Sequence, residues 1–251
     1  MSAAVQHLGA RLAGALARGG LLEPPRDGAP ASREDAYAVQ EALLAQLDET
    51  VAAWKVGTAP DPDPVWGSPL PRRCVMPSPA RVRWPAGAVC GLEAEIAFRF
   101  ARDFPADSLP DSDGEILESL ESMALAVEIV SSRWRGWPEV PDLLKLADLQ
   151  NHGLLVLGEP VPYRPDFPFL VPRAALRVDG TDVSKHPAGN PAGDPRRLLA
   201  PFVRQCAARG LPVAAGHWIT TGSYSGIHFA QAPADVRATL EALPPLHLSI
   251  A

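Results

Sequence analysis

The sequence predicts an α+β protein in which two N-terminal helices precede a mostly β body. Two apolar stripes with the period of a helix fall within the first 50 residues. From residue 51 the apolar segments become short and end in Gly or Pro, a pattern typical of strands. The 28 prolines are dense between residues 60 and 85, where helices should be rare because proline lacks the backbone N–H that a helix needs.

The two N-terminal helices are predicted from their apolar faces. The first face consists of Val5, Leu8, Leu12 and Leu16. An acid-free start that contains arginine also resembles an organelle transit peptide, but the stripe favours a structural helix. The second helix should begin after Ser32, a good N-cap residue, and end near residue 47. Its face consists of Ala36, Val39, Leu43 and Leu47.

Further elements follow from alternation and from turn residues. Strands are predicted at residues 51–56, 90–100, 126–130, 154–157, 218–221 and 246–250. Helices are predicted at residues 114–124 and 196–209, and Pro201 should kink or bound the second one.

Composition and charge exclude several classes of protein. With 251 residues, 47% apolar and 21% charged, the chain can bury a substantial core and is not disordered. Its net charge of −6 comes with no basic face for a nucleic-acid backbone. No apolar run approaches the roughly 20 residues of a membrane span, so we expect a cytoplasmic protein. Cys74, Cys90 and Cys206 form no CxxC pair, which argues against a disulfide framework or zinc site and predicts buried thiols.

Two glutamates lie on one face of the strand predicted at residues 90–100. Successive side chains of a strand point to opposite sides, so Glu93 and Glu95 share a face opposite the apolar residues between them. Two carboxylates roughly 7 Å apart repel each other unless they are solvated, protonated or bridged by a cation. A solvated strand face and a cation site both explain the pair.

A third glutamate, Glu128, lies inside an apolar run at residues 123–130. A lone buried carboxylate is costly, so it should pair with a base, be protonated or bind a metal. Three oxygen ligands would suit Mg²⁺ or Mn²⁺. The alternative is a structural ion pair, with Arg133 or Lys145 as the partner.

Lys55 lies in the apolar run 53–56, another predicted strand. Lysine is rarely buried without a purpose. It could bind a substrate carboxylate or donate a proton, although a surface lysine with a buried stem is the ordinary interpretation.

Seven short motifs occur in a fixed order along the chain: Tyr37-Ala-Val-Gln40, Trp54-Lys-Val-Gly57, Gly91-Leu-Glu-Ala-Glu95, Ala126-Val-Glu-Ile-Val130 with Arg133, Leu146-Ala-Asp148, Leu155-Val-Leu-Gly158 and Thr220-Thr-Gly-Ser223. This ordered set resembles the 2-keto-4-pentenoate hydratases of the fumarylacetoacetate hydrolase superfamily. The likeness covers about residues 33 to 229, and the ordered set is far more specific than any one motif.

The resemblance implies a mixed β-roll with a helical N-terminal cap. Residues 1–80 would form the cap region and residues 81–251 the catalytic domain. It also implies Mg²⁺ or Mn²⁺ as cofactor and a homo-oligomer. The implied metal ligands are Glu93, Glu95 and Glu128, and the implied substrate-binding residues are Lys55, Thr221, Gly222 and Ser223.

The family's substrates are small 2-oxo or 2-hydroxy-dienoic acids from aromatic compound catabolism, such as 2-hydroxypenta-2,4-dienoate. A metal that binds the carboxylate and keto oxygens would stabilise the charge that enolisation places on the keto oxygen. Hydration, decarboxylation and C–C hydrolysis all use such an enolate, so the metal ligands do not distinguish them.

Departures from the family pattern bear on the reaction. The hydrolytic branch uses an N-terminal His–Glu pair, and this chain has no histidine between His7 and His152, which disfavours C–C hydrolysis. Val65 stands where the hydratase motif has Asp, so a proton-transfer group is missing, and Asp61 or Asp63 could replace it.

His152 stands where the family has small polar residues. It is a candidate acid or base, together with Lys55, although a single loop histidine more often bonds to a backbone group. We therefore expect a metal-dependent hydratase, with a decarboxylase, a C–C hydrolase or a catalytically silent accessory subunit as alternatives. A structural acidic cluster without metal is a further alternative.

Overall fold

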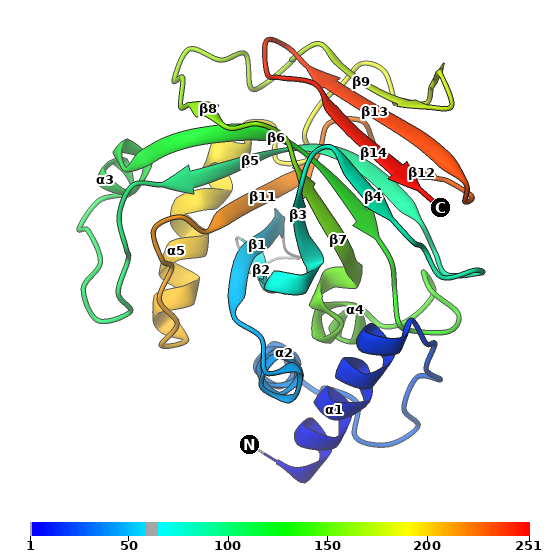
Figure 1. Ribbon diagram of the computed structural model, residues 1–251. Helices are drawn as coiled ribbons and strands as arrows, with labels where there is room; N and C mark the ends of the chain where they lie inside the picture. Colours follow the sequence, from blue (N-terminus) through cyan, green and yellow to red (C-terminus); the bar gives the residue numbers. More distant parts are fainter. Residues whose placement is uncertain (1, 59–64) are drawn as a thin grey trace.

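The computed structural model describes residues 2–58 and 65–251. Within these residues the strands form one nine-stranded and one five-stranded sheet, here called the larger and the smaller sheet. Figure 1 shows the larger sheet curling into a half-barrel, with the smaller sheet stacked on one side and helices α1 and α2 beneath it. The protein therefore has the α+β architecture that the sequence predicts.

Both sheets are mixed, because each combines antiparallel hairpins with parallel pairs. The larger sheet runs in the order β2-β1-β11-β5-β6-β7-β3, and the smaller in the order β10-β9-β13-β14-β4. The strands of the larger sheet are β1 Val51–Thr58, β2 Val65–Pro71, β3 Val75–Pro77, β5 Gly91–Phe100, β6 Leu120–Val130, β7 His152–Leu157, β8 Val161–Pro162, β11 Trp218–Ser223 and β12 His228–Phe229. Those of the smaller sheet are β4 Ala80–Val82, β9 Ala174–Val178, β10 Thr181–Asp182, β13 Ala234–Leu240 and β14 Leu246–Ile250.

The helices cover the edges of this body. They are α1 Ala3–Arg18, α2 Arg33–Leu47, α3 Asp113–Glu118, α4 Asp142–Ala147 and α5 Leu199–Ala208, with short 3-10 turns η1 Arg72–Cys74, η2 Leu149–Asn151 and η3 Pro195–Leu198. Ser32 caps α2 by accepting a hydrogen bond from the backbone of Asp35, as predicted. In α1, a Cβ at Gly9 would lie 2.6 Å from the Cβ of Ala42, so glycine permits the close approach of the two helices.

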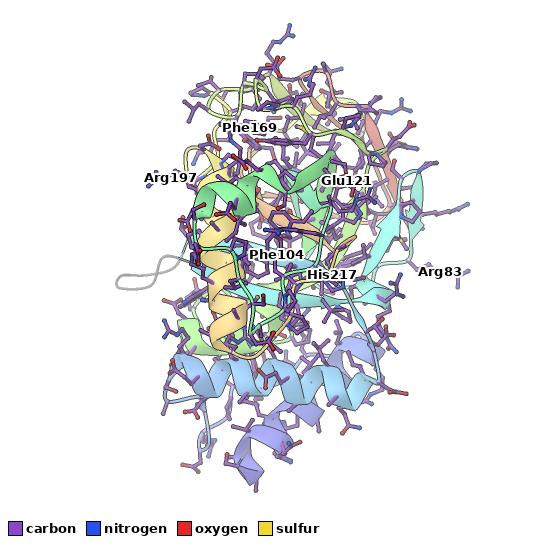
Figure 2. All side chains as sticks on the ribbon, turned by 90° about the vertical axis from the view of Figure 1, so that its left-hand side faces the viewer. Arg83, Phe104, Glu121, Phe169, Arg197 and His217 are labelled. Atoms are coloured by element: carbon purple, nitrogen blue, oxygen red, sulfur yellow. The ribbon has the colours of Figure 1, made fainter. Side chains whose placement is uncertain are left out.

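The two faces of β5 differ in character, because one packs in the core and the other carries Glu93 and Glu95. Leu92, Ala94, Ile96 and Phe98 point into the apolar core between the two sheets. Figure 2 shows the side chains that fill the molecule, with the buried Phe104 and Phe169 among those labelled. The residues of β5 that alternate with Leu92, Ala94, Ile96 and Phe98 face the concave side of the larger sheet. The alternation predicted from the sequence is therefore confirmed.

Two helix predictions need correction. The helix predicted at 114–124 ends at Glu118, because Leu120 onwards pairs with β5 as strand β6 and is buried along almost its whole length. The helix predicted at 196–209 is divided into η3 and α5. Pro201 lies in the first turn of α5, where the missing N–H costs no helical hydrogen bond.

The predicted cap region 1–80 contributes to more than one layer. Strands β1 to β3 belong to the larger sheet, so the helical layer of this region is residues 3–47. The boundary at residue 80 stays a prediction. All three cysteines are buried and unpaired, as expected. Among the described residues, no helix combines the length and the apolarity needed to cross a membrane.

A buried ion pair fixes the segment that leads into β7. Nε of Arg133 lies 2.5 Å from Oδ1 of Asp148, and Oδ2 of Asp148 accepts the backbone N–H of Arg133 at 2.8 Å. Both side chains are at most 5% exposed. The guanidinium also donates to the backbone oxygen of His152. Arg133 thus ties the end of β6 to the start of β7.

Replacing Asp148 by alanine should destabilise the fold strongly, because it leaves the Arg133 cation buried without a partner. We expect a loss of about 3–5 kcal/mol in the free energy of unfolding. Chemical denaturation monitored by circular dichroism measures it. Asp142→Ala is the matched control, since Asp142 forms an exposed pair with Lys145 that should contribute only about 0–1 kcal/mol. Equal losses in the two variants would contradict this role of the buried pair.

Candidate metal centre

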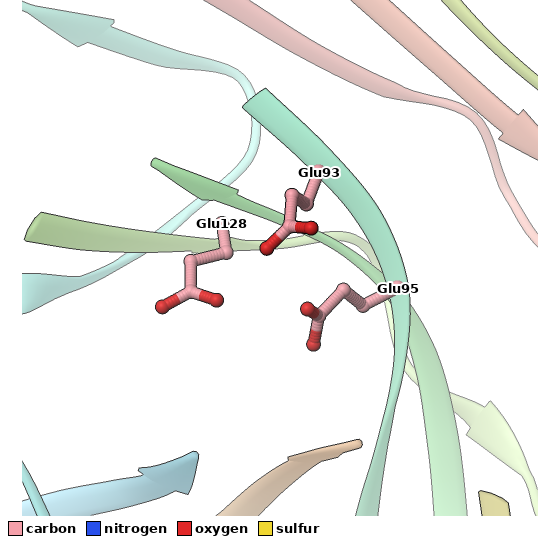
Figure 3. Close-up of side chains that lie close together, drawn as sticks. All are labelled: Glu93, Glu95 and Glu128. Carbon is pink, nitrogen blue, oxygen red and sulfur yellow. The ribbon is translucent and has the colours of Figure 1, made fainter. Parts of the chain in front are cut away.

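The register of β5 and β6 brings the three predicted glutamates together. Glu93 pairs directly with Glu128 across the two strands, and Glu95 follows two residues later on the same face of β5. Oxygen atoms of the three carboxyl groups all lie within 4.8 Å of one another. Figure 3 shows the three side chains pointing into one common space.

Burial sets the charge state of two of these acids. Glu95 is 1% exposed and Glu93 is half-buried. Burial raises the pKa of Glu95 to about 8, and the neighbouring Glu128 and Glu93 carboxylates add to the rise. Burial also raises the pKa of Glu93, to about 7, although Lys55 opposes the rise. Without a cation, both groups therefore hold protons near neutral pH.

Glu128 is the exception because two bases lie against it. Burial would raise its pKa, but the Lys55 cation and the His152 hydrogen bond outweigh burial and lower it. Nζ of Lys55 lies 2.9 Å from Oε2, and Nδ1 of His152 lies 2.8 Å from Oε1. Glu128 is therefore ionised although it is fully buried.

The ion-pair partner of Glu128 is Lys55, and the two partners considered from the sequence are wrong. Arg133 binds Asp148 and Lys145 binds Asp142. Burial lowers the pKa of Lys55, but the three carboxylates, Glu128 first, more than compensate and raise it. Lys55 is thus a cation fixed at the centre, and its Nζ also donates to the backbone oxygen of Gln150 at 3.2 Å.

His152 is completely buried and faces Glu128 rather than a backbone acceptor. Burial lowers its pKa, and Lys55 and Arg133 lower it further, against the raising effect of Glu128. The neutral ring then carries its proton on Nδ1, which donates to the carboxylate. Its Nε2 is buried and has no hydrogen-bond partner among the described residues.

An unusual turn delivers Gln150 and His152 to the centre. Leu149, Gln150 and Asn151 have φ of 50°, 54° and 59°, a left-handed conformation that costs free energy in residues other than glycine. The hydrogen bonds from Arg133 to the backbone oxygens of Asp148 and His152 hold both ends of the turn. The side chain of Gln150 donates to the backbone oxygen of Lys55 and so links the turn to β1.

The end of β11 binds Glu95 through Thr220 and Gly222. The Thr220 hydroxyl and the backbone N–H of Gly222 both donate to Oε2 of Glu95, the latter at 3.1 Å. Thr221 instead donates to the backbone oxygen of Ile96. Ser223 donates to the backbone oxygen of Gly226 at 3.0 Å. Of residues 221–223, Gly222 hydrogen-bonds to Glu95 and Ser223 is the strand partner of Glu95, and their expected role in substrate binding stays a prediction.

Three residues of the centre were missed from the sequence. Alternation along β11 would have placed Thr220 and Gly222 on one face and found Thr220. Gln150 and Asn190 lie in loops without such a pattern. Asn190 is buried, and its amide donates to the backbone oxygens of Thr221 and Gly222 at 2.9 and 2.8 Å. It fixes the turn at Gly222, whose φ of 92° requires glycine.

Val65, which stands where the hydratase motif has Asp, is fully buried at the start of β2. This position therefore contributes to the core. Asp61 and Asp63, the suggested replacements, lie outside the described residues.

The charges of the centre suit a divalent cation. With all three glutamates ionised and Lys55 protonated, the cluster would carry a net charge of two minus, because His152 is neutral. Hard ions such as Mg²⁺ and Mn²⁺ prefer carboxylate oxygens, and the three glutamates supply them at suitable mutual distances. An ion held by Glu93, Glu95 and Glu128 would relieve the repulsion that protons relieve in its absence.

The architecture is shared with several solved enzymes. The chain is similar to 4-oxalocrotonate decarboxylase from Pseudomonas putida G7, complexed with magnesium and adipate, with a TM-score of 0.84 at 16% identity over 98% of this chain and 97% of that one. It is also similar to fumarylpyruvate hydrolase from Pseudomonas aeruginosa in complex with Mn²⁺ and pyruvate, with a TM-score of 0.57 at 15% identity over 79% and 88%. For 2-hydroxyhepta-2,4-diene-1,7-dioate isomerase from Mycobacterium marinum the TM-score is 0.58 at 15% identity over 81% and 76%.

No family model matches the sequence, and neither does any curated protein. The chain has the α+β fold of fumarylacetoacetate hydrolase type, with a curled mixed sheet and N-terminal helices. The predicted fold is therefore confirmed. At 15–16% identity these likenesses establish the fold and not the reaction.

The affinity for Mg²⁺ should rise with pH. Glu93 and Glu95, with pKa near 7 and 8, must lose their protons to bind a cation. We expect the affinity to increase from pH 6 to pH 8 and to level off above about pH 8.5. At pH 7, binding should release about one to two protons. Titration calorimetry in buffers of different ionisation enthalpy measures both quantities.

Glu95→Gln separates this site from surface carboxylates. It removes one ligand and the group with the higher pKa, so affinity should fall at least tenfold and the release of protons at pH 7 should decrease. Glu118→Gln is the control, since Glu118 is exposed on α3. Unchanged Mg²⁺ binding in Glu95→Gln would favour a purely structural acidic cluster.

Proposed function

We propose that this protein is a divalent-metal-dependent lyase acting on a small unsaturated 2-oxo acid, with Mg²⁺ or Mn²⁺ held by Glu93, Glu95 and Glu128. The observation that carries the proposal is the convergence of these three carboxyl groups beside one fixed cation, Lys55. The decarboxylase and hydrolase of the same fold were solved with magnesium and with Mn²⁺, which supports the choice of metal.

The metal would supply a Lewis acid that stabilises negative charge on a keto oxygen. The residues of the chain would orient the substrate around it. Lys55 remains protonated, so its Nζ can bind a substrate carboxylate or supply a proton. We propose substrate contacts for residues 221–223 through their turn, which Asn190 holds in place.

Decarboxylation fits the described residues better than hydration. Loss of carbon dioxide leaves an electron pair that moves onto the keto oxygen, and only a later protonation of carbon is needed. Hydration also needs a base to activate water. Among the residues that the structure describes, Lys55 is protonated and Nδ1 of His152 donates to Glu128, so hydration would have to use the buried Nε2 of His152 as its base.

The extent of the structural likeness supports decarboxylation over hydrolysis. The decarboxylase matches nearly the whole of both chains, whereas the hydrolase matches 79% of this one. We therefore rank decarboxylation first and hydration second. Hydrolysis of a C–C bond ranks third, since the chain has no histidine between His7 and His152.

Product analysis distinguishes the three reactions. We expect the Mg²⁺-loaded protein to release carbon dioxide from an unsaturated 2-oxo diacid such as 4-oxalocrotonate. A hydroxylated product from 2-hydroxypenta-2,4-dienoate would instead identify a hydratase, and two acids from a fumarylpyruvate-type substrate a hydrolase. Mass spectrometry of the products separates these outcomes. Absence of turnover of all three substrates, with Mg²⁺ or Mn²⁺ bound, would contradict the proposal and favour an accessory subunit.

Lys55→Met tests the role of the fixed cation. It should lower kcat by a factor of about 10²–10⁴, the usual range for loss of a proton-transfer group, while Mg²⁺ binding persists. Lys145→Met is the matched control, because Lys145 pairs with Asp142 on the surface. Steady-state kinetics and calorimetry provide the two readouts. Full turnover in Lys55→Met would exclude a role for this residue in the reaction.

A further inference from the structure

The concave side of the larger sheet changes character along its strands. The acidic centre occupies one part of it, at Glu93 and Glu95 of β5. Farther along the same face of β5 come Ala97 and then Arg99, which is about 13 Å from Glu95 along the strand. The neighbouring strands follow the same order, since Thr220 pairs with Ala97, and Trp218 with Arg99.

An apolar plug lies between these two parts of the concave side. It consists of Ala53, Leu70, Ala97, Ala126, Leu155 and Leu157. All six side chains are buried, and they form a cluster separate from the core between the two sheets. Buried alanine and leucine side chains from several strands meet here. The region beyond the plug is therefore separated from the three glutamates.

Beyond the plug the structure has a pocket of about 600 Å³. Its apolar wall includes Val75, Met76, Leu157 and the ring of Trp218. Its polar wall is formed by the cations Arg72 and Arg99 and by His217. Among the lining residues that the structure describes, none is acidic, although the chain as a whole carries a net charge of −6.

The two arginines leave hydrogen-bonding capacity unused. Arg99 gives one nitrogen to Glu121 at 3.0 Å and places its guanidinium over the Trp218 ring, 5.0 Å from the centroid. Its Nε is buried and has no hydrogen-bond partner within the described parts of the chain. Arg72 is exposed on η1, and its side chain forms no ion pair with any of the described residues. Figure 2 presents the face on which Glu121 and His217 lie.

His217 adds a third polar group with a defined orientation. Its Nδ1 accepts a hydrogen bond from Nε1 of Trp54 at 3.3 Å, so the neutral ring carries its proton on Nε2. Burial first, and then the Arg72 cation, lower the pKa of His217, while Asp103 raises it. Asp103 itself accepts the backbone N–H of Ala215 at 2.6 Å. Because the Arg72 cation lowers the pKa of His217, the two side chains lie close to each other.

We propose that this pocket binds a small organic anion with a flat apolar body, of the aromatic carboxylate class, independently of the metal centre. The anionic group would take the free donors of Arg72 and Arg99, and the ring would lie against Trp218 and Met76. Guanidinium groups match the geometry of carboxylates, and a pocket of this volume accommodates a single substituted ring. The site goes beyond the proposed lyase reaction, because the plug separates it from the three glutamates.

Benzoate is the probe that tests the site. The full chain, treated with a chelator, is titrated with benzoate in a calorimeter, with benzyl alcohol as the uncharged analogue. We expect a Kd of about 1 mM or lower for benzoate, no detectable binding of benzyl alcohol, and weaker binding when the salt concentration rises from 0.05 to 0.5 M, as expected for an exposed charge. No heat of binding up to 10 mM benzoate would overturn the proposal.

Variants locate the site. Arg72→Gln and Arg99→Gln should each weaken benzoate binding at least fivefold, and Trp218→Phe should remove the quenching of tryptophan fluorescence by benzoate. Arg177→Gln on β9 is the matched control and should bind normally, since Arg177 is exposed on the smaller sheet. Arg72 is exposed, so its variant reports on binding even where Arg99→Gln lowers stability.

The metal centre is tested in the same assay. Benzoate should bind equally to wild type and Glu95→Gln, with or without Mg²⁺. A requirement for Mg²⁺, or loss of binding in Lys55→Met while Arg72→Gln binds normally, would place benzoate at the metal centre and refute a separate site. A failure of the lyase proposal would leave this result unchanged, because no turnover is measured.

Discussion

Electrostatic repulsion among three buried carboxyl groups is the constraint on which this structure depends. The pairing of β5 with β6 places carboxyl oxygens of Glu93, Glu95 and Glu128 within 4.8 Å of one another, where solvent screens them poorly. Lys55 and His152 stabilise the charge on Glu128 alone. The other two must therefore hold protons or share a cation. Under the proposed function, this competition between proton and metal would distinguish the centre from a closed structural ion pair.

The backbone turn beside the centre costs free energy, which a buried ion pair near it offsets. Three consecutive left-handed residues lead into β7, and only their exact path allows Gln150 and His152 to reach Lys55 and Glu128. The Arg133–Asp148 pair, in a fully buried position, holds this path. Strain of this kind persists where the surrounding structure over-determines it, which is common near functional groups. The site and the connection from β6 to β7 are thus coupled through one arginine.

The sequence predicted those parts that depend on local pattern. Alternation placed Glu93 and Glu95 on one face, and the cost of a lone buried acid brought Glu128 into the same site. The ion-pair partner of Glu128 depends on which strands lie close together in the sheet. Lys55 of β1 reaches Glu128 because β11 connects β1 to β5 and β6. This order could not be read from the sequence, and Arg133 and Lys145 were therefore wrong. The helix expected at 114–124 failed for a similar reason, because pairing with β5 outweighs the helical tendency of residues 120–124. The contact of Thr220 with Glu95 follows from the pleat of β11, which turns Thr221 to the other side, where it bonds to Ile96.

One barrel interior thus contains two opposite electrostatic environments. Acids gather where β5 pairs with the C-terminal end of β6, and cationic groups gather four residues farther along the same face of β5. Alanine and leucine side chains between them exclude water, so each environment keeps its own field instead of forming direct ion pairs with the other. If Arg99 lay two residues earlier, at the position of Ala97, it would face Glu95 and neutralise a carboxyl group that a cation needs. The spacing along a single strand therefore keeps the basic side chains away from the three glutamates, as both the proposed metal site and the proposed anion site require.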